Sequence, residues 1–171
     1  MKPINTPRLV LRPYETHDIE ALHNILSDNK TMSFWPAPFT IEQTSRWIER
    51  SSKSYRENQF GRFAVELKES GKLIGDCGIL LSELDGKQEN DLGYIIHGNY
   101  WGRGYGTEAA RASLDYAFKK LGLSRIAANM DVNNLASIKV AEKIGMKKEK
   151  EYLNKRNRNL LTYLYAIHNK K

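Results

Sequence analysis

The feature that most constrains this chain is a run of three glycines between a strand-like segment and a helix-like segment. The run reads Trp101-Gly102-Arg103-Gly104-Tyr105-Gly106-Thr107, and it follows the segment 91–96 and precedes helical periodicity that begins near residue 107. Glycine adopts backbone conformations that other residues avoid, so such a loop lets backbone N–H groups converge on a phosphate beside the positive end of a helix. The sequence therefore predicts a site for a phosphate-bearing cofactor.

The spacing of the glycines restricts the type of cofactor. A Walker loop ends in Gly-Lys-Ser/Thr, whereas Gly106 is followed directly by Thr107. A dinucleotide fingerprint reads G-x-G-x-x-G early in a repeating strand-helix-strand sheet, whereas this chain has G-x-G-x-G late, after an expected antiparallel meander. Both nucleotide classes are disfavoured. A plain strand-to-helix turn remains the alternative for the glycines taken alone.

The rest of the chain predicts one α/β domain spanning residues 1–171. The length and a hydrophobic content of 40% suffice for one buried core. Strands are expected at 8–12 (an edge strand), 63–67, 73–81, 91–96, 125–132 and 160–167, and helices at 41–57, 107–121 and 135–144, with a short one capped by Thr16 or Asp18. Gly122 is expected to stop the second of these long helices. The order indicates a mixed, mainly antiparallel sheet flanked by helices.

Charge and cysteine content exclude several classes. There is no run of eighteen apolar residues and no leader, so a cytoplasmic protein without a membrane segment is expected. The single cysteine, Cys77, excludes an internal disulfide, and the four histidines lack zinc-ligand spacing, so no metal is expected. Of the net charge of +7, the segment 147–158 carries six basic residues against two acidic ones. That segment is either a solvated basic surface or a field that attracts a polyanion.

Two blocks of the sequence resemble the GNAT acetyltransferase superfamily. Gly104 and Gly106 stand at the small-residue positions of its acetyl-CoA loop, Gln/Arg-x-x-Gly-x-Gly/Ala, and the block 131–146 resembles its Asn-x-x-Ser helix with the Glu-Lys-x-Gly-Phe ending. Trp101 departs from the Gln/Arg position. The pattern Trp-Gly-x-Gly-Tyr-x-Thr-Glu-Ala, together with the opening 6–12, resembles the branch of ribosomal-protein N-terminal (alanine/serine) acetyltransferases. The resemblance implies the GNAT fold and an acetyl-CoA-dependent N-acetyltransferase.

The resemblance also implies which residues hold acetyl-CoA. The pantetheine arm would lie between the strands 91–96 and 125–132, with the N–H near Ile96 as oxyanion donor. The pyrophosphate would lie on backbone N–H groups of the glycine loop. The implied cofactor-binding residues are Ile95, Ile96, Trp101, Gly102, Arg103, Gly104, Tyr105, Gly106, Thr107, Asn134 and Ser137. Asparagine is also a preferred helix cap, and both roles are compatible.

The catalytic assignments depart from the family at one position. Ala141 stands where the superfamily commonly has a tyrosine, the usual general acid, so Ser137 becomes the candidate partner of the leaving thiolate. A purely structural serine is the alternative. Asp91 is the candidate base, with Glu89 behind it, and a solvated strand-end charge is the alternative. Cys77 is expected to be a buried small side chain and His97 a loop-packing residue.

The acceptor implied by the resemblance is a primary amine, with a protein N-terminus as the leading hypothesis. An α-amine with a pKa near 8 loses its proton far more readily at neutral pH than lysine, whose pKa is near 10.4. A small-molecule amine acceptor (polyamine, aminoglycoside or amino acid) and a noncatalytic CoA- or RNA-binding module are the alternatives. Nucleic acid is expected only through a ribosomal substrate. A monomer and a homodimer both remain open.

Overall fold

The core of the fold is a single eight-stranded sheet. A computed structural model describes residues 1–169, and the strands follow the order β1-β2-β3-β4-β5-β6-β8-β7. Their bounds are β1 Ile4–Asn5, β2 Leu9–Arg12, β3 Arg62–Leu67, β4 Leu73–Leu84, β5 Lys87–Ile96, β6 Arg125–Asp131, β7 Lys147–Asn154 and β8 Leu160–His168. Every neighbouring pair is antiparallel except β5 with β6, which is parallel. The predicted mixed, mainly antiparallel sheet is confirmed.

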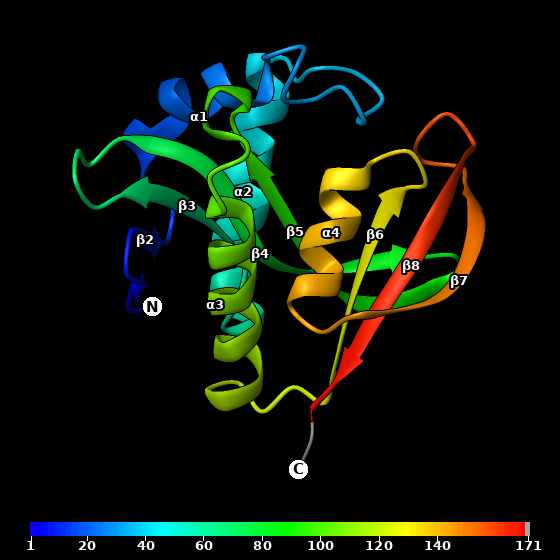
Figure 1. The fold of residues 1–171 in the computed structure, drawn as a ribbon. Coiled ribbons are helices and arrows are strands. Elements are labelled where there is room, and N and C mark those ends of the chain that lie inside the picture. Colours follow the sequence, from blue (N-terminus) through cyan, green and yellow to red (C-terminus); the bar gives the residue numbers. More distant parts are fainter. Residues whose placement is uncertain (170–171) are drawn as a thin grey trace.

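The helices divide between the two faces of the sheet. Their bounds are α1 Ile19–Leu26, α2 Ile41–Asn58, α3 Tyr105–Lys119 and α4 Leu135–Lys143, with 3₁₀ turns at Thr16–Asp18 and Gly98–Tyr100. One cluster of buried residues joins α3 and α4 to the sheet, and a second joins α1 to the other face; Figure 1 shows α3 and α4 side by side in front of the strands. Successive residues of β5 contribute to different clusters, Ile95 to the second and Ile96 to the first, as the pleat of a strand requires.

The two central strands separate shortly after they meet. β4 and β5 stay paired over ten registered positions, whereas β5 and β6 share one, Asp91 opposite Ala127. Beyond this pair the strands diverge, and Figure 1 shows their arrowheads pointing apart. Because a strand normally finds hydrogen-bond partners on both sides, this divergence leaves backbone groups of β5 facing a gap.

Local signals in the sequence account for the helix starts next to this gap. Thr40 and Gln43 form the predicted capping box of α2, with the Thr40 amide 2.8 Å from the Gln43 side-chain oxygen. α3 begins after Gly104, whose φ of 81° lies in the left-handed region that favours glycine. α4 begins after Asn134, whose side chain accepts the Ser137 N–H at 3.1 Å.

Some predicted boundaries were wrong. The strand at 8–12 is not at the edge, because β1 pairs with it and covers its outer side. α3 starts at Tyr105 rather than Thr107 and its last helical residue is Lys119. Gly122, with a φ of 66°, ends the helix as expected, because the Leu123 N–H bonds back to the Ala117 carbonyl at 3.1 Å across it. Two strands, β1 and β7, were not expected from the sequence, and they form the two edges of the sheet.

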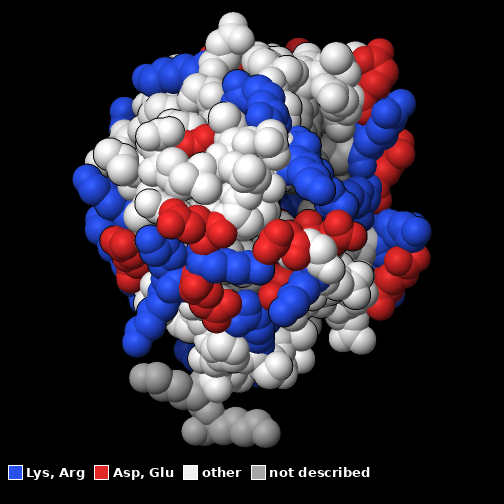
Figure 2. Space-filling view, turned by 90° about the vertical axis from the view of Figure 1, so that its right-hand side faces the viewer, with Lys and Arg blue, Asp and Glu red and all other residues white. Residues whose placement is uncertain are grey.

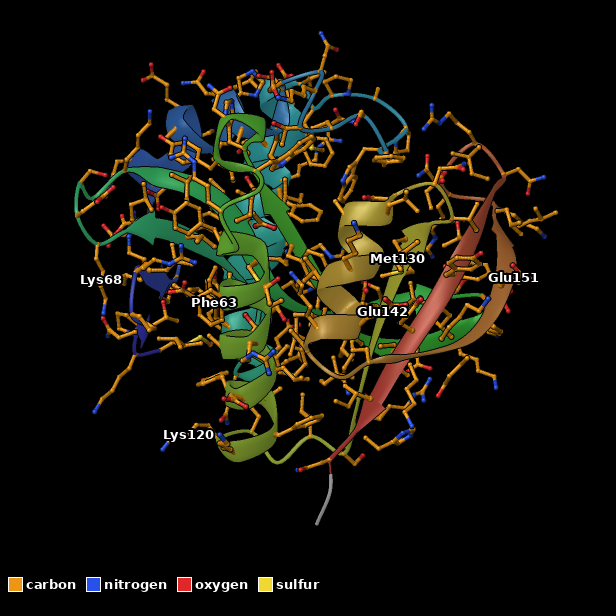
Figure 3. All side chains as sticks on the ribbon, viewed as in Figure 1. Phe63, Lys68, Lys120, Met130, Glu142 and Glu151 are labelled. Carbon is orange, nitrogen blue, oxygen red and sulfur yellow. The ribbon has the colours of Figure 1, made fainter. Side chains whose placement is uncertain are left out.

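β7 accounts for most of the basic segment 147–158. Its charged residues alternate with partly buried ones, and charges on an edge strand discourage pairing with another chain. Figure 2, which turns this side of the molecule to the viewer, shows basic and acidic side chains interleaved in a band, and Figure 3 shows Glu151 pointing outward from β7. This exposure is expected for a solvated basic surface, and the alternative, a field that attracts a polyanion, stays a prediction.

A buried ion pair connects α2 with the centre of the sheet. Arg62 on β3 and Asp76 on β4 are 4% and 0% exposed and contact each other through the guanidinium and the carboxylate. The Trp47 indole N–H donates to the same carboxylate at 2.9 Å, and the Tyr14 hydroxyl is a third donor to it. The Arg62 guanidinium also fills the space that a side chain at Gly93 would occupy. The carboxylate of Asp76 thus holds the side chains beneath β5 in place.

We expect replacement of Asp76 by alanine to lower the free energy of unfolding by about 3–5 kcal/mol, because it leaves the Arg62 charge buried without a partner. Chemical denaturation followed by circular dichroism measures this. The control is Asp115→Ala on the exposed face of α3, where a surface pair with Lys119 is lost at a cost of a few tenths of a kcal/mol. A loss below about 1 kcal/mol for Asp76→Ala would contradict a supporting role for the pair.

Candidate active site

The glycine loop leads directly into α3 and is held in place by Arg8. Gly102 and Gly104 both have positive φ, 75° and 81°. The loop is held from outside by Arg8, which donates to the Arg103 carbonyl at 2.8 Å and pairs with Glu108 at 2.7 Å. The first N–H groups of a helix lack partners within the helix, so the start of α3 presents donors and a partial positive charge to the space above it. The geometry fits an anion such as the pyrophosphate of CoA.

Trp101 fixes the end of β5 to this loop. Its indole Nε1–H donates to the Ile96 carbonyl at 2.7 Å, while much of the ring is exposed. This hydrogen bond is a structural reason for a tryptophan at the position where the chain departs from the family motif. Sequence reasoning assigned Trp101 to the cofactor but did not find this contact, because an indole-to-backbone bond leaves no spacing pattern.

The backbone of Ile96 points into the gap between β5 and β6. His97 N–H donates to the Ile74 carbonyl of β4 at 2.9 Å, and hydrogen-bonded and non-hydrogen-bonded pairs alternate along an antiparallel ladder. Ile96, opposite Gly75, is thus a non-hydrogen-bonded position, and its carbonyl bonds to Trp101 instead of β4. Its N–H faces away from β4. Ile95, opposite Asp76, is bonded to β4 and directs its side chain to the α1 face.

A cleft of about 630 Å³ opens where β5 and β6 part. Aromatic side chains from the loop before α2 and from α2 itself form one wall, and Trp35 and Trp47 pack edge to face at 5.8 Å. The β7–β8 turn forms the opposite wall, and the Asn157 side chain reaches across to the Phe34 carbonyl at 2.8 Å. The predicted residues Asp91, Asn134 and Ser137 all line this cleft.

Asp91 is partly buried on the floor of the cleft. Burial raises the pKa of its carboxyl group above the ordinary value, although the nearby Arg62 charge and a hydrogen bond from Asn129, at 3.3 Å, act in the opposite direction. A carboxyl group with a raised pKa is a better proton acceptor when it ionises. Glu89, the second candidate, is paired with Arg125 at 3.1 Å, so its carboxylate is already engaged.

Ser137 and Asn134 lie at the start of α4, across the gap from β5. The Asn134 side-chain oxygen caps the helix, so the predicted cap role is present. The Ser137 hydroxyl donates to the Tyr94 hydroxyl at 3.2 Å, and Tyr94 donates to the Ser137 carbonyl at 2.8 Å. Figure 3 labels Met130 on β6 and Glu142 on α4, which lie on the far side of the gap from β5. Tyr94 is a cleft residue that sequence reasoning missed, because only the fold brings it to α4.

Two other reactive side chains take no part in the cleft. Cys77 is fully buried against Ser113, and burial raises the pKa of its thiol to about 12, so it is unsuited to act as a nucleophile. His97 accepts the Asn99 N–H at 3.2 Å and caps the short turn after β5. Both agree with the structural roles expected from the sequence.

Within residues 1–169, no cluster of three or more histidine, cysteine or acidic side chains has the arrangement of a metal site. Over the same residues, no helix combines the length and apolar character needed to cross a membrane.

We expect Asp91→Asn to stabilise the protein at neutral pH. A carboxyl group whose pKa is raised on folding contributes stability only while it is protonated, and this contribution is lost as the pH rises through the folded pKa. The free energy of unfolding of the variant should therefore exceed that of the unmutated protein above about pH 4, by an amount that grows with pH and then levels off. Denaturant titrations between acidic and neutral pH measure the difference.

The matched control is Asp18→Asn, for which the opposite sign is expected. Burial alone would raise the pKa of Asp18, but hydrogen bonds from Arg12 and from the Glu15 backbone outweigh it and lower the pKa. Its ionised form therefore stabilises the fold, and the variant should lose stability as the pH rises. An Asp91→Asn variant that is less stable than the unmutated protein at neutral pH would show that the charge of Asp91 is favourable where it lies.

The comparisons with known proteins identify the family of the chain. Residues 8–147 match the family model described as acetyltransferase (GNAT) domain. The uncharacterized N-acetyltransferase YnaD of Bacillus subtilis is 33% identical over 168 residues, covering 96% of this chain and 95% of that protein. The spermidine N(1)-acetyltransferase of Escherichia coli is 26% identical over 147 residues, covering 84% and 75%. A GNAT-family acetyltransferase structure from Bacillus anthracis superposes with a TM-score of 0.84 at 30% identity, covering 99% of this chain and all of that one. The α/β sheet with its parted central strands is thus the GNAT fold, and the chain belongs to the GNAT family of N-acetyltransferases.

Proposed function

We propose that this N-acetyltransferase moves an acetyl group directly from acetyl-CoA to a primary amine, and that the amine is the N-terminus of a peptide or protein. The observation that carries the proposal is the backbone N–H of Ile96, which points away from β4, one residue beyond Ile95, the last residue of β5 that lines the cleft. A fixed backbone donor at that place suits the negative charge that develops on a thioester oxygen during attack.

The cofactor half of the site would consist of the glycine loop, the start of α3 and the edge of β5. Acetyl-CoA supplies an acetyl thioester, and its pyrophosphate would accept hydrogen bonds from backbone N–H groups between Arg103 and Thr107. The positive φ of Gly104 gives this loop a shape that glycine adopts readily. The amide nitrogen of Asn134, whose oxygen caps α4, would be free to bind a pantetheine carbonyl.

Asp91 would accept the proton of the amine. Its carboxyl group borders the cleft and is held by Asn129, on the face of β5 that carries Ile95 rather than the face that carries Ile96. An amine entering from the side of Trp35 and Trp47 would therefore pass Asp91 before it reaches the edge of β5. Cys77 is buried away from this path, which supports direct transfer without an acyl-enzyme.

The charges around the cleft favour a peptide amine over a polycation. Three acidic side chains near its mouth are already paired: Glu83 with Arg156 at 3.6 Å, Asp85 with Lys150 at 2.6 Å and Glu89 with Arg125 at 3.1 Å. With a net charge of +7, the protein would repel a polycation at long range, whereas a peptide N-terminus carries one weakly held proton. The resemblance of the segment 101–109 to the ribosomal-protein branch points to the same acceptor.

Spermidine is the second candidate. The relative from Escherichia coli named for this activity supports it, and so does the partly buried aromatic wall of the cleft, because aromatic rings attract ammonium groups. Trp35 and Trp47 line the cleft from one side. A polycation would need unpaired acidic residues at the mouth of the cleft, whereas a peptide N-terminus would not. A direct comparison of the two acceptors therefore separates them.

We expect a short peptide beginning with alanine or serine to be acetylated with a kcat/KM at least about tenfold above that of spermidine, because a monocation suffers less repulsion. Release of CoA thiol measures turnover, and mass spectrometry locates the acetyl group. Prior formylation of the peptide N-terminus is the control and should abolish the reaction.

Three results of this comparison have distinct meanings. Activity on the free peptide alone supports the proposal. Turnover of spermidine or kanamycin without turnover of peptides would replace the proposed acceptor by a small-molecule amine. Binding of acetyl-CoA without turnover of any amine would indicate a noncatalytic module.

We expect Gly104→Glu to weaken acetyl-CoA binding at least about a hundredfold, because the substitution strains a backbone with a φ of 81°, disturbs Arg8, which holds the loop and lies 3.4 Å from the position of the new Cβ, and adds a negative charge next to the proposed anion site. Isothermal titration calorimetry measures the affinity. The matched control is Gly71→Glu in the turn between β3 and β4, where φ is 67° and a Cβ would contact nothing within 4 Å. It imposes the same backbone strain without approaching the loop, and equal weakening by both variants would contradict the assigned site.

A further inference from the structure

A pair of hydroxyl groups bridges the gap between β5 and α4. The Tyr94 hydroxyl donates to the Ser137 carbonyl at 2.8 Å, and the Ser137 hydroxyl donates to the Tyr94 oxygen at 3.2 Å. Both side chains line the cleft. Each hydroxyl therefore fixes the position of the other at the place where the two strands have parted.

The Tyr94 hydroxyl contacts α4, the helix that carries Ala141 at the position where the family commonly has a tyrosine. Ser137 and Ala141 are four residues apart and share one face of the helix. The methyl group of Ala141 is fully buried in the cluster that holds α3 and α4 on the sheet, and the Tyr94 ring packs against the same cluster. A phenol hydroxyl is thus present one helical turn from Ala141, but the sheet supplies it instead of the helix.

We infer that the Tyr94 hydroxyl donates the hydrogen bond that stabilises the departing CoA thiolate, and that Ser137 positions Tyr94 for this task. The inference rests on the proposed function and deepens it. Ser137 assists through Tyr94: by donating to the Tyr94 oxygen it holds the phenol, whose own hydrogen then turns from the Ser137 carbonyl toward the sulfur.

The atoms of the step balance without another reactant. The amine nitrogen forms a bond to the acetyl carbon, the C–S bond breaks, and its electron pair stays on sulfur. The nitrogen loses one proton to Asp91 or to water, and the thiolate gains one from solvent. Tyr94 stabilises the thiolate until then, and a hydrogen bond to a charged acceptor is worth about 1.5–3 kcal/mol.

The surroundings of Tyr94 suit a donor that keeps its proton. Burial raises the pKa of its hydroxyl above the ordinary value, and the nearby Cys77 and Asp91 act in the same direction, whereas the hydrogen bond with Ser137 opposes them. The phenol is therefore neutral throughout the working range of pH, and its hydrogen remains available to an anion.

The test measures the ionisation of the thiol of bound CoA, which requires no acceptor amine. CoA labelled with carbon-13 next to the sulfur is bound to the protein and titrated by NMR. Tyr94→Phe should lower the ionisation constant of the bound thiol about tenfold, which is the loss of one charged hydrogen bond. Ser137→Ala should lower it by a smaller factor, because Tyr94 remains. Tyr116→Phe, which removes another partly buried hydroxyl on α3, is the control and should leave the constant unchanged.

Kinetics with the best acceptor complete the test. Tyr94→Phe should lower kcat about 10- to 100-fold with little change in the calorimetric affinity for CoA, and the double variant with Ser137→Ala should lose little more than Tyr94→Phe alone. A bound thiol unaffected by Tyr94→Phe would overturn the inference, and so would a larger effect of Ser137→Ala. The thiol titration does not depend on acetylation of an amine. It can therefore contradict the role of Tyr94 while the peptide acceptor is confirmed, and the reverse outcome is equally possible.

Discussion

The parting of β5 and β6 after the single registered pair Asp91 and Ala127 is the constraint on which the site depends. A parallel pair that stayed together would satisfy the backbone of β5 on both sides and leave no donor for a ligand. β4 pairs with the other edge of β5 over ten positions, so the edge that faces β6 is the one left free beyond Asp91. The start of α4, the glycine loop and the cleft all lie around that edge.

Much of the cofactor half could be predicted from the sequence because it is built from local signals. A glycine with positive φ before α3, an asparagine cap before α4 and the capping box of α2 each involve neighbours in the chain. β7 escaped detection because its charged alternation at the sheet edge lacks the apolar face that marks a strand. Tyr94 and Trp101 escaped because their partners, Ser137 and the Ile96 carbonyl, are set by the fold. Such contacts leave no periodic pattern in the sequence.

Electrostatics around the cleft differs from the impression given by the net charge. Several basic residues near the cleft are held in ion pairs that connect neighbouring strands, as in Arg125, which contacts both Glu89 and Glu149. Beneath the cleft, Arg62 is paired with Asp76 and lies against Gly93. Its positive charge lowers the pKa of Asp91 and so opposes the effect of burial. Close to the cleft, an approaching amine thus meets paired acidic groups together with Asp91, a partly buried carboxyl group whose hydrogen-bond donor is the Asn129 side chain.

The bond between Asn157 and the Phe34 carbonyl joins positions 123 residues apart in sequence across the mouth of the cleft. The mouth is therefore shared by two peripheral segments, the loop before α2 and the β7–β8 turn, whereas the glycine loop and α4 lie between them in the chain. Insertions or substitutions in either peripheral segment can reshape the entrance without moving the cofactor side. This division would let the choice of amine change independently of the machinery proposed for acyl transfer.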